Sequence, residues 1–121
     1  MPSIPTEAPK DPQHVKELAE KDYEAEVLKA TVPVVLDFSS DDGAACKALA
    51  PRFGAVAEKY EGKIRFLKVL QSANPGLSDT LAIKTTPTLV FFKNGKEVGE
   101  RLTGDDIKRT ALKAQVDALL T

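Results

Sequence analysis

The chain has 121 residues, of which 42% are hydrophobic and 29% are charged, and its formal net charge at pH 7 is −1. This length and composition predict one compact domain with its own hydrophobic core. Nothing in the small net charge suggests the basic surface typical of nucleic-acid and membrane binding, and no apolar run approaches the roughly 20 residues that cross a bilayer. We therefore expect neither a nucleic-acid partner nor a membrane partner.

The first fourteen residues differ in composition from the rest of the chain. Four prolines fall within the first twelve residues, and this stretch has no apolar core of the kind found in secretory signals. We predict that residues 1–14 form a flexible N-terminal arm and that residues 15–121 form the domain. We expect a cytoplasmic location.

From residue 15 onward, the apolar residues alternate between the period of strands and the period of helices. Val15–Leu18 is expected to be a short strand, and Asp22–Lys29 a short helix. Pro33–Phe38 (PVVLDF) is an apolar run with one aspartate, which is typical of a central strand buried on both faces. The apolar positions over Leu49–Tyr60 recur at helical spacing, and Gly62 follows as a stop signal.

The second half of the chain continues this alternation. Lys63–Leu70 is a buried-strand candidate, and Asn74–Ala82 is a short helix with a proline near its start. Thr88–Phe92 and Lys96–Thr103 are strands joined by an Asn-Gly hairpin turn, and Asp105–Leu120 is a closing amphipathic helix. This order predicts an α/β fold with a mixed central sheet of 4–5 strands and helices on both faces.

Cys46 is the only cysteine, within the stretch SSDDGAACKALAP at residues 39–51. A single cysteine excludes an internal disulfide. The chain also has one histidine, His14, far from Cys46 in sequence, which argues against a structural zinc site. We expect no metal and no cofactor, and any redox chemistry at Cys46 would need a second thiol from outside the chain.

The segments PVVLDF, CKALAP, NPGL and IKTTPTLVFFKNG, followed by a closing helix, resemble the thioredoxin family over roughly residues 15–121. The resemblance implies the thioredoxin fold. In that family, a Trp-Cys-Gly-Pro-Cys-Lys segment opens the second helix; its first cysteine attacks a substrate disulfide and its second resolves the mixed disulfide. The matching positions in this chain are Asp42, Gly43, Ala44, Ala45, Cys46 and Lys47.

The resemblance therefore puts Gly43 where the attacking cysteine should be and Cys46 at the resolving position. Because a dithiol reductase needs both thiols, we expect no competent dithiol–disulfide reductase activity. Asp42 replaces the tryptophan of the family segment. Its carboxylate suits the cap of a helix that begins at Gly43, and its negative charge works against a thiolate at Cys46.

The resemblance also implies roles for residues outside this segment. Asp37 matches a buried acid that relays protons to the resolving cysteine, and Lys68 matches the lysine beside that acid. The alternative for Asp37 is a buried polar group without a role. Thr86-Pro87 matches the cis-proline that faces the site, either as an edge that pairs with a peptide or as a structural turn. Gly104 lies one residue from a family glycine that borders the same groove.

Two functions stay open. The first is a non-catalytic module that binds a protein or an extended peptide, with Cys46 a small buried apolar residue. The second is a monothiol redox protein that forms mixed disulfides with glutathione or a partner through Cys46 in redox homeostasis. A helix start favours the thiolate, whereas the expected depth of the thiol opposes this reading. We expect a monomer, and the predicted groove residues are Asp42, Gly43, Ala44, Ala45, Thr86, Pro87 and Gly104.

Overall fold

The structure, a computed structural model, describes residues 15–40, 43–104 and 107–120. Its five strands form one sheet in the order β1-β3-β2-β4-β5. Strands β1, β3 and β2 run parallel, whereas β4 is antiparallel to β2 and β5 is antiparallel to β4. The mixed sheet predicted from the sequence is confirmed. The strand bounds are β1 Lys16–Glu17, β2 Val34–Ser39, β3 Arg65–Leu70, β4 Thr88–Lys93 and β5 Lys96–Thr103.

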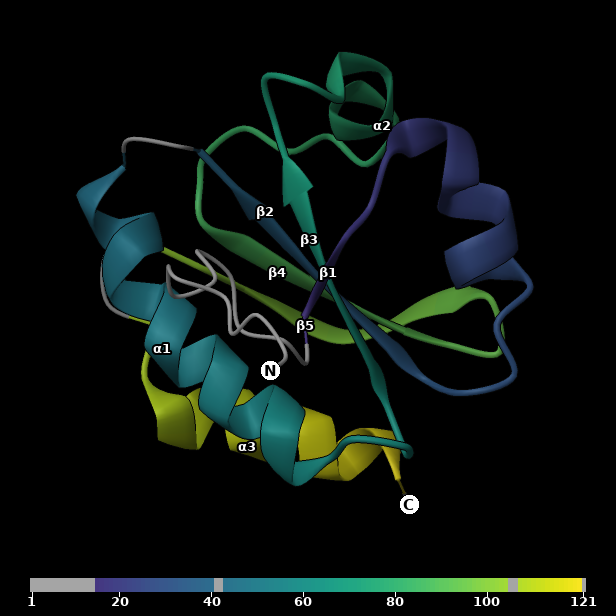
Figure 1. The fold of residues 1–121 in the computed structure, drawn as a ribbon, viewed down its shortest axis with the longest axis vertical. Helices are drawn as coiled ribbons and strands as arrows, with labels where there is room; N and C mark the ends of the chain where they lie inside the picture. The colour runs from purple at the N-terminus through teal and green to yellow at the C-terminus, as the bar shows by residue number, and fades with distance from the viewer. Residues whose placement is uncertain (1–14, 41–42, 105–106, 121) are drawn as a thin grey trace, which may run out of the picture.

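Helices cover both faces of this sheet (Figure 1). Helices α1 (Ala44–Lys59) and α3 (Arg109–Leu119) lie together on one face. Helix α2 (Pro75–Thr80) lies on the other face, with a 3₁₀ turn, η1 (Glu20–Asp22), and a π-helical turn, η2 (Glu24–Leu28). Within the described residues, no helix is long and apolar enough to cross a membrane.

Strand β2 separates two hydrophobic clusters, which explains its continuous apolar run. All six of its residues are buried. Val34, Leu36 and Phe38 belong to the cluster on the α2 face, whereas Val35 belongs to the cluster beneath α1 and α3. Since alternate residues of a strand point to opposite faces, a strand between two layers must be apolar on both.

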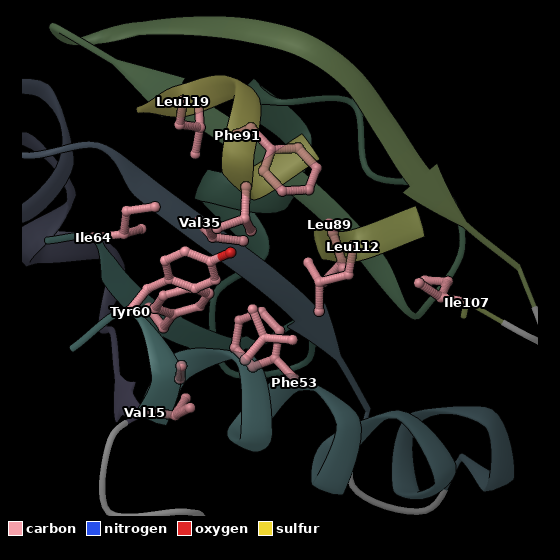
Figure 2. Packing of buried hydrophobic residues seen from close by; sticks show 14 of the residues in the cluster. Val15, Val35, Phe53, Tyr60, Ile64, Leu89, Phe91, Ile107, Leu112 and Leu119 are labelled. Carbon is pink, nitrogen blue, oxygen red and sulfur yellow. The ribbon is translucent and has the colours of Figure 1, made fainter. Parts of the chain in front are cut away.

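The cluster beneath α1 and α3 holds those helices against the sheet. Figure 2 shows Phe53 of α1 and its C-cap residue Tyr60, with Leu112 and Leu119 from α3, around Val35 of the sheet. The rings of Phe53 and Phe66 also meet edge to face, with their centroids 5.4 Å apart. Aromatic pairs in this geometry add to the stabilisation that burial itself supplies.

The helix predicted at Asp22–Lys29 has a different form in the structure, where η1 and η2 replace one regular helix. Contacts with α2 hold the start of this segment: the Glu20 N–H donates to Asn74 Oδ1 at 2.8 Å, and Glu20 Oε1 accepts from the Leu77 N–H at 2.9 Å. Val27 is buried beneath it. These long-range contacts outweigh helix propensity over so short a segment.

Two helix starts also differ from the prediction. Helix α1 begins at Ala44 with Gly43 as its N-cap, so the cap expected at Asp42 is one residue too early; Asp42 itself lies outside the described residues. Helix α3 begins at Arg109, later than expected. Ile107 is buried just before α3, and its carbonyl accepts a hydrogen bond from Arg52 at 3.0 Å, which holds this backbone outside the helix.

The hairpin between β4 and β5 follows the sequence signal. Asn94 and Gly95 both have positive φ, 55° and 78°, as a type I′ turn requires. A Cβ atom at Gly95 would lie 2.6 Å from the carbonyl oxygen of Leu28. Both the backbone conformation and the neighbouring segment therefore require glycine at this position.

Candidate functional site

Cys46 lies in the first turn of α1 and its side chain is only 7% exposed. The sulfur accepts a hydrogen bond from the backbone N–H of Ser40 at 3.4 Å, and the Ser40 hydroxyl is 3.7 Å from the same atom. The thiol is thus shielded from solvent, and two polar groups of one residue contact it.

Ser40 also connects this thiol to the segment before β4. The Thr86 hydroxyl donates to Ser40 Oγ at 3.4 Å, and the peptide bond between Thr86 and Pro87 is cis. Cys46, Ser40 and Thr86 therefore meet beyond the carboxyl end of β2. Ser40 was not among the site residues predicted from the sequence. Its signal was its position directly after a central strand, where ligand sites in α/β sheets gather.

The space beside Gly43 is occupied by the Ser40 side chain. A Cβ atom at residue 43 would lie 2.6 Å from Ser40 Oγ and 3.4 Å from the Cys46 sulfur. Gly43 has φ −76°, which any residue adopts. A side chain at residue 43 is thus limited by the serine hydroxyl rather than by the backbone.

The loop residues that precede Cys46 are more accessible than the thiol. Ala44 is exposed, and Gly43 and Ala45 are partly exposed. On the other side of Ser40, Thr86 is partly exposed and Pro87 is buried. These residues were all predicted to line one groove. Those that solvent reaches have small side chains, apart from Thr86.

A cluster of three threonines supports the backbone of the cis-proline segment. Thr103 Oγ1 lies 3.0 Å from the hydroxyls of both Thr85 and Thr88 and donates to the carbonyl oxygen of Pro87 at 3.2 Å. Gly104 follows Thr103, is exposed and has φ +114°. The threonine cluster was not predicted from the sequence, because the pairing between β4 and β5 creates it.

Asp37 lies deeper, within β2, and is 4% exposed. It is the register partner of Lys68 on β3. By strand alternation, Asp37 faces the same side as Val35, which is the side covered by α1. The structure therefore places the Asp37–Lys68 pair and Cys46 in the same layer, between the sheet and α1.

This arrangement can present an accessible backbone edge and hydroxyl groups to a ligand. Its one sulfur is shielded, and no group of three or more histidine, cysteine, aspartate or glutamate side chains suited to a metal ion occurs among the described residues. Asp42, the remaining predicted groove residue, lies outside the described residues.

Comparison with known proteins places these observations in context. The family model described as Thioredoxin matches residues 14–118. Thioredoxin from Peptoclostridium acidaminophilum is 37% identical over 100 residues, which cover 83% of this chain and 90% of that protein. Thioredoxin 1 from a Nostoc species is 35% identical over 82 residues, covering 68% of this chain and 77% of that protein. Thioredoxin X, chloroplastic, from Arabidopsis thaliana is 33% identical over 107 residues, covering 88% of this chain and 58% of that protein.

Proposed function

Since this chain belongs to the thioredoxin family, we propose that it is a member that binds a protein or an extended peptide without reducing a disulfide. The observation that carries the proposal is the contrast between a shielded thiol and the more exposed residues around it. Cys46 is 7% exposed, whereas Ala44 is exposed and Thr86 is partly exposed. With Gly43 at the position of the attacking cysteine, a bound partner forms no covalent bond there.

Binding in this groove uses the backbone before the cis-proline. An extended peptide pairs with the N–H and C=O groups of Thr86, as peptides do when they add to the edge of a sheet. The Thr86 and Ser40 hydroxyls supply further hydrogen-bonding groups, and their contact at 3.4 Å holds them side by side. The small side chains of Gly43, Ala44 and Ala45 leave room for the side chains of the peptide.

A second candidate function is monothiol redox chemistry at Cys46. The backbone N–H of Ser40 favours it, because it donates a hydrogen bond to the Cys46 sulfur at 3.4 Å and can stabilise negative charge that develops there during a reaction. In this reaction the Cys46 thiolate attacks one sulfur of glutathione disulfide. A mixed disulfide forms, the original disulfide bond breaks and one glutathione thiolate leaves. The burial of Cys46 opposes this step and ranks it second.

A titration with carboxymethylated insulin B chain, an extended peptide without free thiols, tests the binding proposal. We expect backbone amide shifts in nuclear magnetic resonance spectra at Gly43, Ala44, Thr86 and Gly104. Ala44→Arg should weaken binding, whereas Ala111→Arg, at an exposed position of α3, should not. Shifts that avoid the groove, or equal effects of the two variants, would contradict the proposal.

The rate of Cys46 alkylation separates the two candidates. In the binding module, iodoacetamide labels the native protein far more slowly than the unfolded chain between about pH 6 and 9. Rapid native labelling at neutral pH, together with a glutathionyl adduct after incubation with glutathione disulfide, would favour the monothiol function. Insulin reduction above background would contradict both.

Our proposed location is the cytoplasm, although Thioredoxin X is described as chloroplastic.

A further inference from the structure

A cavity of about 380 Å³ lies between the second half of α1 and the first half of α3. Ala55, the lining residue nearest in sequence to Cys46, is roughly 13 Å farther along the helix axis, given a rise of about 1.5 Å per residue. The cavity is therefore separate from the groove of the proposed function. Its volume falls within the roughly 300–1,000 Å³ range of small-molecule sites.

Two sets of hydrogen bonds join α1 and its C-cap residue Tyr60 to α3 and the segment before it, one on each side of this cavity along the helices. At one end, Arg52 Nη1 donates to the carbonyl oxygen of Ile107 at 3.0 Å. At the other end, the Tyr60 hydroxyl donates to Asp117, which also pairs with Lys113 at 2.8 Å. Figure 1 shows α1 and α3 on the same face of the sheet, and Figure 2 shows Tyr60, the C-cap residue of α1, in the core cluster. The walls of the cavity are therefore held in place without a ligand.

The lining combines an apolar wall with positive charge. Ala55 and Val56 of α1 and its C-cap residue Tyr60 line the cavity on one side, and Thr110 adds a hydroxyl-bearing side chain from α3. The charged lining residues are all cationic: Lys59, Arg109 and Lys113.

Only two of these three cations are available to a ligand. Lys113 already has a partner, because its ammonium group donates a hydrogen bond to Asp117 at 2.8 Å. This hydrogen bond lowers the pKa of Asp117 and raises the pKa of Lys113. Lys59 and Arg109 are exposed, and neither forms an ion pair within the part of the chain that the structure describes. Asp117 also interacts with Lys59 through space, so an anionic group at the rim would meet one partly compensated cation, Lys59, together with Arg109.

We propose that this cavity binds a small amphipathic organic anion. Its apolar body lies against Ala55, Val56 and Tyr60, and its carboxylate, sulfonate or phosphate group meets Lys59 and Arg109. A purely inorganic anion would leave the apolar wall uncovered, and a neutral apolar molecule would make no ionic contact with Lys59 and Arg109. The lining thus favours a molecule that has both an apolar body and an anionic group.

Two fluorescent probes with the same ring system test this site. 8-Anilinonaphthalene-1-sulfonate carries the negative charge, and N-phenyl-1-naphthylamine lacks it. We expect the sulfonate to bind more tightly and to shift the amide resonances of Val56, Tyr60 and Thr110 in the native protein. Lys59→Gln combined with Arg109→Gln should weaken sulfonate binding by about fivefold or more and leave the neutral probe unchanged.

One further variant is a control and another is a second test of the site. Lys96→Gln removes an exposed positive charge on the β4–β5 hairpin and should change neither affinity. Ala55→Leu fills the cavity from an exposed helical position, so the fold should persist while both probes lose binding. Equal affinity for the two probes, resonance shifts outside the cavity, no binding at all, or an equal loss from Lys96→Gln would each overturn the proposal.

Discussion

At the scale of single residues, the Ser40 side chain limits which side chains fit at residue 43 beside Cys46. Its hydroxyl lies between the sulfur of Cys46 and the hydroxyl of Thr86, and it is 2.6 Å from the position of a Cβ atom at residue 43. No real Cβ atom tolerates that approach, but a serine side chain can rotate away. Restoring a thiol at residue 43 therefore requires Ser40 to lose its present contacts.

This crowding leads to a comparison of two variants. We expect Gly43→Cys to show weak insulin reduction, and Gly43→Cys combined with Ser40→Ala to show more, because alanine removes the colliding oxygen. Ser40→Ala alone should stay at background, since it adds no second thiol. If the single and double variants reduce insulin at the same rate, then Ser40 does not limit the site.

Among the secondary-structure elements, α1 and α3 are joined by a polar group of three side chains. The hydrogen bond to Asp117 raises the pKa of Tyr60 and also raises that of Lys113. The hydrogen bonds from Lys113 and then from Tyr60 lower the pKa of Asp117. The three groups are thus most favourable to the fold when Asp117 is charged, Tyr60 is neutral and Lys113 is charged.

The stabilisation from this group depends on pH at both ends of the range. Because the pKa of Asp117 is lowered from 3.8, its contribution is complete above about pH 4 and is lost as the pH falls through the folded-state value. Because the pKa values of Tyr60 and Lys113 are raised from 10.0 and 10.5, their contributions are complete below about pH 10 and are lost as the pH rises further.

Thermal unfolding of Asp117→Asn tests this dependence. We expect the variant to have a lower Tm than the wild type, with the largest difference between about pH 5 and 9 and a smaller one on either side. Asp79→Asn changes an exposed carboxylate on α2 and should give a difference that stays nearly constant. Parallel pH profiles for the two variants would show that the contact between α1 and α3 adds no pH-dependent stability.

For the whole molecule, stability comes from two apolar clusters that share the sheet. Leu112 of α3 is fully buried in the cluster beneath α1, whereas Leu36 of β2 is fully buried in the cluster on the α2 face. Because β2 contributes to both clusters, loss of packing on one face removes support from the other. The chain should therefore unfold as one cooperative unit.

Two leucines near the C-terminus test the depth of this packing. We expect Leu112→Ala to lower the free energy of unfolding by about 2–5 kcal/mol, because it leaves a cavity between α3 and the sheet. Leu120→Ala, at a side chain that is 43% exposed, should change it by less than about 0.5 kcal/mol. Urea unfolding measures both. A small loss from Leu112→Ala would mean that α3 contributes little to the core.

Most of the sheet was predictable because its signals are local. The segment PVVLDF predicts a strand buried on both faces, and Asn94-Gly95 predicts a tight hairpin turn. Neither prediction needs information about residues far away in the sequence. The segment around Tyr23 and Val27 was predicted less well. Its form depends on contacts of Glu20 with Asn74 and Leu77, which no local pattern reveals.

The sequence alone established the order of elements and the single cysteine, because residue identity and spacing are properties of the linear chain. It also predicted, by resemblance, that Gly43, Cys46 and Thr86-Pro87 match the family segments. The shielding of Cys46, the position of Ser40 between it and Thr86, and the cavity between α1 and α3 emerged only in three dimensions. Ser40 and Thr86 are 46 positions apart, and sheet pairing with helix packing brings them together. Contacts at that separation depend on the whole fold, which explains why local patterns did not reveal them.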